Sequence, residues 1–315
     1  MLISQAVEGF LMDRGAGDLA ERTVQLYRDC LRHFIKYHQD TELSMVTHDE
    51  LVRFMQFMKS EYLPGKPAKG IHASPSYVDN HWKAIRSFFG WCNKTLKIPR
   101  PDLDLPRIKY MLPEIQPYTE EEVIKIVQAV EFTKVATTNG RRAFRMKRPT
   151  AIRDKALILL LLDTGMRVGE VMRLKMEDVN LDSSEVRVRP YDTGLKSQSR
   201  TLPLGKNTKR ALWLYFVQRL NDDPRPGDSV FMLNGQSIKS LFRRLEERTG
   251  INNIHAHRFR HTFAICFLRN GGDVFSLKRL LGHKTLEMVQ HYLALAHTDV
   301  VEAHRRASPV DRWHL

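Results

Sequence analysis

The stretch LGHKTLEMVQHYLAL, residues 281–295, has the apolar spacing of an amphipathic helix, with Leu286, Val289 and Leu293 on one stripe. Tyr292 lies within it, nine residues after His283. Most tyrosines in such helices are core aromatics whose hydroxyl reaches water. The alternative is a tyrosine that acts as a nucleophile. The segment predicts a helix at 285–295, and the rest of the chain must decide between the two roles.

Working back from this helix, residues 118–296 are predicted to form one mainly helical domain. Helices are expected at 118–130, 206–220, 237–248, 257–270 and 273–281. The exception is SSEVRVRPYDTGLKSQSRTLPL (183–204), whose alternating Val186, Val188 and Leu202 predict a β-hairpin with Lys196 near its turn. Thr119 and Glu122 form a capping-box pattern at the start of the domain.

The N-terminal part of the chain predicts a second, helical domain. Helices are expected at 20–38, from Thr47 onward and at 74–96. Five prolines in 98–117 and the lack of periodicity predict a linker there. The fold class is therefore mainly α with a small β-hairpin, in two domains. The expected divisions are a helical domain at 1–97, a linker at 98–117, the second domain at 118–296 and a C-terminal tail at 297–315.

The composition indicates a polyanionic partner. Lys and Arg number 50 against 36 for Asp and Glu, giving a formal net charge of +14. The excess is uneven, with +3 over residues 1–110 and +11 over 111–315. Such a charge favours nucleic acid, although a basic surface can also be merely solvated. The apolar run ALILLLL (156–162) is too short to span a bilayer. With no signal peptide expected and three scattered cysteines, the prediction is a cytoplasmic, nucleoid-associated protein without a membrane partner.

Two further segments carry residues suited to binding a phosphate. In DTGMRVGE (163–170) a helix is expected to end at Gly165, and Glu170 is placed to fix the Arg167 guanidinium. In HAHRFRHTFA (255–264), His257 and Arg260 are at i and i+3 on a helix, so they point the same way. We expect this pair on an exposed face, with Phe259, Phe263 and Cys266 toward the core. Guanidinium groups suit phosphate because they are planar, bidentate and always charged.

Metal and nucleotide sites are not expected. Four histidines gather in these segments, at positions 255, 257, 261 and 283, but no acidic or cysteine ligand completes a zinc set. No phosphate-binding loop of the ATPase type exists in the sequence. The sequence therefore predicts a protein that works without a cofactor.

Taken together, the polar residues match phosphodiester cleavage by a side-chain nucleophile. A tyrosine hydroxyl has a pKa near 10 and needs help to attack. Two arginines would stabilise charge on the five-coordinate phosphate, histidines would move protons, and a lysine could protonate the leaving oxygen. The residues in question are Arg167, Lys196, His257, Arg260, His283 and Tyr292, with Glu170 in support.

The ordered set TGMRVGE, HRFRHTFA and LGH followed by Tyr292 resembles the tyrosine recombinase family of phage-type and transposon integrases and chromosome-dimer resolvases. The resemblance implies that Arg167 and Arg260 hold the scissile phosphate and that Lys196, as the hairpin lysine, is the general acid. It implies attack by Tyr292, with a 3′-phosphotyrosyl intermediate and neither ATP nor metal. It also implies double-stranded DNA sites as substrate, a homotetramer on two synapsed duplexes, and accessory DNA-bending proteins as partners.

Two alternatives stay open from the sequence. A non-catalytic DNA-binding regulator on an integrase-like frame would share the basic charge and the two helical domains, but it has no need of the six polar residues. A topoisomerase-like enzyme would keep the nicking and resealing chemistry and change only the product.

Overall fold

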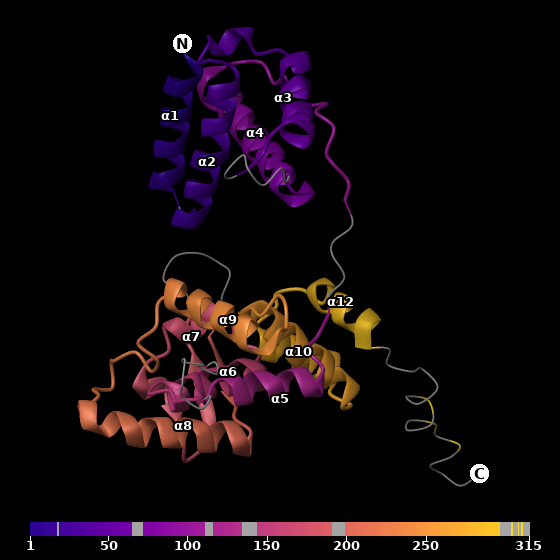
Figure 1. Ribbon diagram of the computed structural model, residues 1–315. Coiled ribbons are helices and arrows are strands. Elements are labelled where there is room, and N and C mark those ends of the chain that lie inside the picture. The colour runs from indigo at the N-terminus through magenta and orange to yellow at the C-terminus, as the bar shows by residue number, and fades with distance from the viewer. Residues whose placement is uncertain are drawn as a thin grey trace. The chain divides into compact units, whose positions relative to one another are not determined.

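The structure is a computed structural model (Figure 1). It describes residues 1–17, 19–64, 72–110, 116–133, 144–190 and 199–296, together with residues 304, 308 and 310. Contacts divide the chain into two compact units, one within residues 1–113 and the other within residues 114–191 and 196–315. In the described residues both units are mainly helical, as predicted.

The first unit is a bundle of four helices. They are α1 (Ile3–Ala16), α2 (Glu21–Tyr37), α3 (His48–Ser60) and α4 (Pro75–Leu96), with a short 3-10 turn η1 (Leu43–Met45) before α3. Helix α4 packs against the other three, and α1 also packs against α2 (Figure 1). The caps follow the sequence: Thr47 accepts a hydrogen bond from the Glu50 amide, and Ser74 accepts one from the Tyr77 amide. Phe88 and Phe89 are fully buried, as expected of core aromatics.

The first half of the proline-rich stretch packs onto this bundle. Leu105 is only 3% exposed, and its carbonyl accepts a hydrogen bond of 3.0 Å from Nε1 of Trp82 on α4. Arg107 makes a bidentate ion pair with the fully buried Asp79 of α4, at 2.8 and 3.1 Å. Residues 98–110 therefore belong structurally with the first unit. The domain divisions at 97 and 117 stay a prediction.

The second unit begins at helix α5 and carries one small sheet. Its helices are α5 (Glu120–Ala129), α6 (Ala151–Thr164), α7 (Val168–Met172), α8 (Lys206–Arg219), α9 (Gly235–Thr249), α10 (Ala256–Arg269), α11 (Val274–Leu281) and α12 (Glu287–Ala296), with 3-10 turns η3 (Met176–Asp178) and η4 (Leu220–Asp222). The sheet is antiparallel in the order β1 (Val179–Asn180), β2 (Glu185–Val188) and β3 (Arg200–Pro203).

The pairing of Val186 with Leu202 confirms the predicted hairpin strands. Strand β1 was not predicted, because two residues are too few to show a period. The hairpin turn, with Lys196, lies outside the described residues, as do residues 134–143 and most of the predicted tail.

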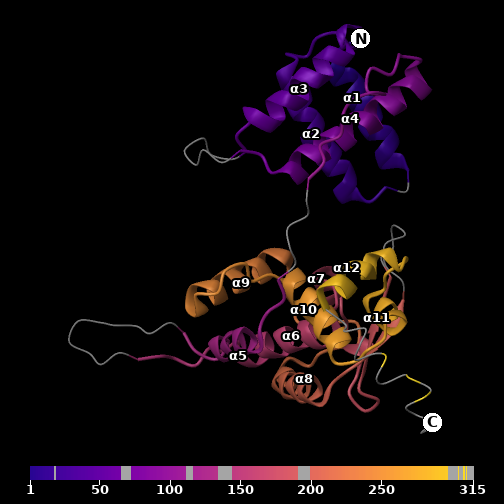
Figure 2. The same ribbon diagram turned by 90° about the vertical axis from the view of Figure 1, so that its right-hand side faces the viewer.

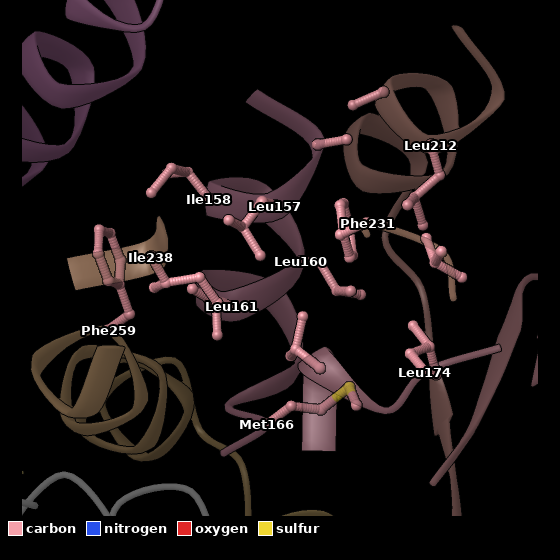
Figure 3. Close-up of a cluster of buried hydrophobic side chains, with 14 of the residues drawn as sticks. Leu157, Ile158, Leu160, Leu161, Met166, Leu174, Leu212, Phe231, Ile238 and Phe259 are labelled. Atoms are coloured by element: carbon pink, nitrogen blue, oxygen red, sulfur yellow. The ribbon is translucent and has the colours of Figure 1, made fainter. Parts of the chain in front are cut away.

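Helix α6 is the centre of the second unit. The run at 156–162 is apolar around the helix because α8 covers one side and α10 another (Figure 2). Figure 3 shows Ile238 and Phe259 on one side of α6 and Leu212 and Phe231 on the other. This packing fixes the C-terminal end of α6 beside α10, which is where the candidate site forms. No helix in the described ranges is long and apolar enough to cross a membrane.

We predict that Leu105→Ala, in a fragment of residues 1–110, lowers the free energy of unfolding by about 2–5 kcal/mol, because it empties a buried site. Leu103→Ala is the matched control, since Leu103 is 58% exposed on the same segment, and it should change that free energy by less than about 0.5 kcal/mol. Urea denaturation followed by tryptophan fluorescence measures both. Equal effects would show that residues 98–110 do not stabilise the bundle.

Candidate active site

The turn between α6 and α7 places the first arginine. Helix α6 ends at Gly165, which adopts a left-handed conformation with φ of 60°. Arg167 then caps α7, and the Glu170 carboxylate accepts a 2.8 Å hydrogen bond from the Arg167 amide. The same carboxylate accepts a 3.3 Å contact from Nη1 of Arg167. The predicted end of α6 and the predicted Arg167–Glu170 pairing are both confirmed.

Arg260, on α10, lies deep in the second unit. It is 1% exposed, and its guanidinium donates to the carbonyls of Gly165 (2.7 Å) and Leu281 (2.8 Å) and to Nε2 of His283 (2.8 Å). The expected exposure was therefore wrong for Arg260, because α11 and α12 pack against α10, and right for His257, which is exposed. Cys266, expected in the core, is exposed instead.

The environment of Arg260 is stabilising in spite of the burial. Gly165 and Leu281 close two helices, and their carbonyls would otherwise lack partners and carry partial negative charge. Desolvation, and then repulsion from Arg167, lower the pKa of Arg260 to about 10, so the side chain stays charged at neutral pH. Three of its five N–H groups are used in these contacts. The others remain for a ligand or for neighbouring side chains.

His283 follows Gly282, which ends α11 with φ of 64°, as the sequence predicted. An arginine can only donate, so Nε2 of His283 must accept the bond from Arg260 and Nδ1 must carry the hydrogen. Nδ1 is buried and has no partner in the described structure. Desolvation, with Arg260 next, lowers the pKa of His283 to about 4. The site therefore holds a neutral imidazole with one unused N–H donor.

Arg200, the first residue of β3, is a site residue that the sequence reasoning missed. It donates to both Glu170 oxygens, at 3.0 and 2.8 Å, and its Nε donates to the Leu280 carbonyl at 2.7 Å. Burial by itself raises the pKa of Glu170, but Arg200 and Arg167 outweigh it and bring the pKa to about 2. Glu170 thus ties the two arginines together. No sequence signal marked Arg200, because its partners are 30 and 80 residues away.

Tyr292 points into the same cluster from α12. It is 5% exposed and packs with Ile265 and Leu281 in a small apolar cluster. Its hydroxyl lies 3.0 Å from Nδ1 of His261, one turn along α10 from His257. Burial raises the pKa of Tyr292, although the positive charge of Arg260 opposes this. In the absence of substrate the nucleophile candidate is a protonated phenol.

The remaining candidates are placed less centrally. The His257 side chain lies at the surface, and its ring centre is 4.3 Å from that of His261. Partial desolvation, followed by Arg260, lowers its pKa. Lys196 lies outside the described residues. Among the residues that the structure describes, no three His, Cys, Asp or Glu side chains gather as metal ligands.

Comparison with known proteins places this fold and site in a family of DNA recombinases. The phage integrase family matches residues 119–298, more than half of the chain, and the chain belongs to this family. Tyrosine recombinase XerC of Roseiflexus sp. (strain RS-1) is 26% identical over 313 residues, which cover 94% of this chain and 90% of that protein. Tyrosine recombinase XerD of Listeria innocua is 26% identical over 98% of each chain.

Solved structures show the same fold. The Tn1549 transposon integrase in complex with circular intermediate DNA superposes with a TM-score of 0.72, at 17% identity, over 97% of this chain and 99% of that one. XerH recombinase bound to a palindromic difH substrate gives 0.67 at 18% identity, over 96% and 83%. These structural similarities confirm the predicted fold class, and the family match over residues 119–298 confirms the predicted family.

We predict that Gly165→Ala destabilises the second unit by about 2–4 kcal/mol, since it forces an L residue into left-handed backbone and crowds the core. An added Cβ would lie 2.4 Å from Phe263 and 2.9 Å from Leu281. The variant should also lose DNA cleavage, because the Gly165 carbonyl holds Arg260. Gly227→Ala, which meets nothing within 4 Å, is the control. Wild-type stability and cleavage for Gly165→Ala would contradict this account.

A second prediction concerns acid stability. The pKa of Glu170 falls from 4.5 to about 2 on folding, so its contribution is complete above pH 4.5 and is lost as the pH falls toward 2. Glu170→Gln should cost on the order of 3 kcal/mol at pH 7, and its disadvantage should shrink at lower pH. Glu247→Gln, on the exposed α9 surface, should cost little at any pH. Urea denaturation from pH 7 to pH 3 tests this, and a Glu170→Gln deficit that stays constant with pH would refute it.

Proposed function

We propose that the protein is a site-specific recombinase that cleaves and rejoins double-stranded DNA, with Tyr292 as the nucleophile. The carrying observation is that the ring of Tyr292 lies 6.3 Å from that of His283, which accepts a hydrogen bond from the buried Arg260 guanidinium. Arg260 lies beside the Arg167–Glu170–Arg200 group, so three arginines share one carboxylate. Such a cluster has an excess of positive charge and suits an anionic ligand. Membership of the phage integrase family and the tyrosine recombinase relatives support the reaction type.

The residues would divide the work on the scissile phosphate as follows. Arg167 and the free N–H groups of Arg260 stabilise the negative charge that grows on the five-coordinate phosphate. His283 donates from Nδ1, and His257 assists from the outer side of α10. Lys196 protonates the leaving 5′-oxygen, a role that comes from the family resemblance. Glu170 holds Arg167 and Arg200 in place.

The chemistry conserves the energy of the bond. Attack by the Tyr292 oxygen forms a 3′-phosphotyrosyl link and releases a 5′-hydroxyl. A 5′-hydroxyl of the partner strand then attacks the same phosphorus and releases the tyrosine. One phosphoester replaces another at each step, so neither ATP nor a metal ion is needed.

The proposal extends to the assembly of the protein on DNA. Both units contact the duplex, four protomers act on two synapsed duplexes in the nucleoid, and residues 297–315 dock on a neighbouring protomer. The net charge of +14 supports a phosphate-dominated grip that weakens with salt. DNA-bending accessory proteins bring the sites together.

The decisive experiment uses Tyr292→Phe on a nicked duplex that carries the recombination site. Wild-type protein should give an SDS-resistant protein–DNA adduct, while the variant should bind the DNA and give none, because it lacks the attacking oxygen. Tyr215→Phe is the control: it loses a buried hydroxyl that donates 2.9 Å to the Val230 carbonyl, far from the chemistry in sequence and role, and it should keep the adduct. An adduct formed by Tyr292→Phe would identify another nucleophile.

A further inference from the structure

The roles proposed above leave one step without a group, the removal of the proton from the Tyr292 hydroxyl. Tyr292 must lose this proton as its oxygen bonds to phosphorus. Nδ1 of His261 lies 3.0 Å from that hydroxyl, which is hydrogen-bond distance. The two rings are 5.5 Å apart between centres. Among the described contacts of the phenol oxygen, the one with a histidine is thus that with His261.

The tautomer of His261 sets the direction of this hydrogen bond. With its hydrogen on Nε2, the neutral imidazole accepts at Nδ1 the hydrogen that the Tyr292 hydroxyl donates. This is the tautomer that a proton acceptor needs.

The other two histidines are arranged for different tasks. Nε2 of His283 is occupied by Arg260, and its Nδ1 already carries a hydrogen, so His283 can donate but not accept at the site. His257 lies at the surface, and its ring packs against the ring of His261. The described contacts of His257 do not include Tyr292.

We propose that His261 takes the Tyr292 proton during DNA cleavage and returns it during rejoining. The inference rests on the proposed function. In cleavage, the O–H bond of Tyr292 breaks and its proton moves to Nδ1 of His261. The phenol oxygen bonds to phosphorus while the bond from phosphorus to the 5′-oxygen breaks, and Lys196 gives that oxygen its proton. In rejoining, the incoming 5′-hydroxyl attacks phosphorus and loses its proton to Lys196, while the phenol oxygen leaves and takes its proton back from Nδ1.

The electrostatic surroundings of His261 are compatible with this role. Desolvation, followed by His257, His255 and Arg260, lowers its pKa to about 4, so the free protein holds it neutral and able to accept a proton. Bound DNA brings phosphates close to these groups. Their negative charge would raise the pKa of His261 and stabilise the imidazolium as it forms.

The test compares His261→Asn with His261→Ala in the full chain, by the single-turnover rate of adduct formation on the nicked duplex. Asparagine places a polar atom near the position of Nδ1 and can hold the phenol, but it cannot take a proton. If His261 accepts the proton, both variants should slow cleavage alike, by roughly 100-fold or more. Their rates should also rise with pH more steeply than the wild-type rate, since solvent must then remove the proton. A wild-type rate for His261→Asn would reduce His261 to a positioning residue and overturn the proposal.

A second measurement avoids variants altogether. On a duplex with a 5′-bridging phosphorothiolate, the leaving sulfur needs no proton, so the proton moved in cleavage is that of Tyr292. Wild-type protein should then cleave more slowly in D₂O than in H₂O, and equal rates would contradict a proton transfer to His261 in the cleavage step. The outcomes separate from those of the parent proposal: if wild-type protein forms no adduct, the recombinase function itself is wrong.

Discussion

The burial of one cation, Arg260, is the constraint around which the second unit is arranged. A charged group in the interior costs several kcal/mol unless acceptors surround it. Here the acceptors are the closing carbonyls of α6 and α11, from Gly165 and Leu281, and one imidazole nitrogen of His283. Each of these helix C-termini gains a hydrogen-bond donor for a carbonyl that would otherwise lack one. The guanidinium in turn is stabilised by the partial negative charge at the C-termini of two helices. The contacts of Arg260 therefore both hold the site residues in position and join α6, α10 and α11 in the core.

The site carries more positive than negative charge. Three guanidinium groups, those of Arg167, Arg200 and Arg260, share one carboxylate, Glu170. His261 and His283 add no charge at neutral pH. Burial, followed by His257, His255 and Arg260, lowers the pKa of His261 to about 4, and burial followed by the arginines does the same for His283. An anion that enters such a site meets fixed donors that need no reorganisation, which is the condition for stabilising charge in a transition state.

Sequence reasoning succeeded where the contacts are local. The end of α6 at Gly165, and the pairing of Arg167 with Glu170, depend on residues within one turn of each other, so spacing reveals them. The hairpin strands and the second-unit helices follow from periodicity for the same reason. The burial of Arg260 could not be predicted, because it depends on a carbonyl 95 residues away. Arg200 looked like an ordinary strand residue until its pairing across 30 residues was visible. The roles of the individual residues remain predictions.

The resting site is also built to be inactive. Burial raises the pKa of Tyr292, so the phenol keeps its proton in the free protein, and the pKa of His261, lowered to about 4, makes its imidazole a weak base. A scissile phosphate changes the second condition, because its negative charge raises the pKa of His261 and makes that imidazole a stronger base. On the proposed roles, the substrate thus strengthens the base that receives the Tyr292 proton. We therefore expect Tyr292 to stay unreactive until DNA occupies the site.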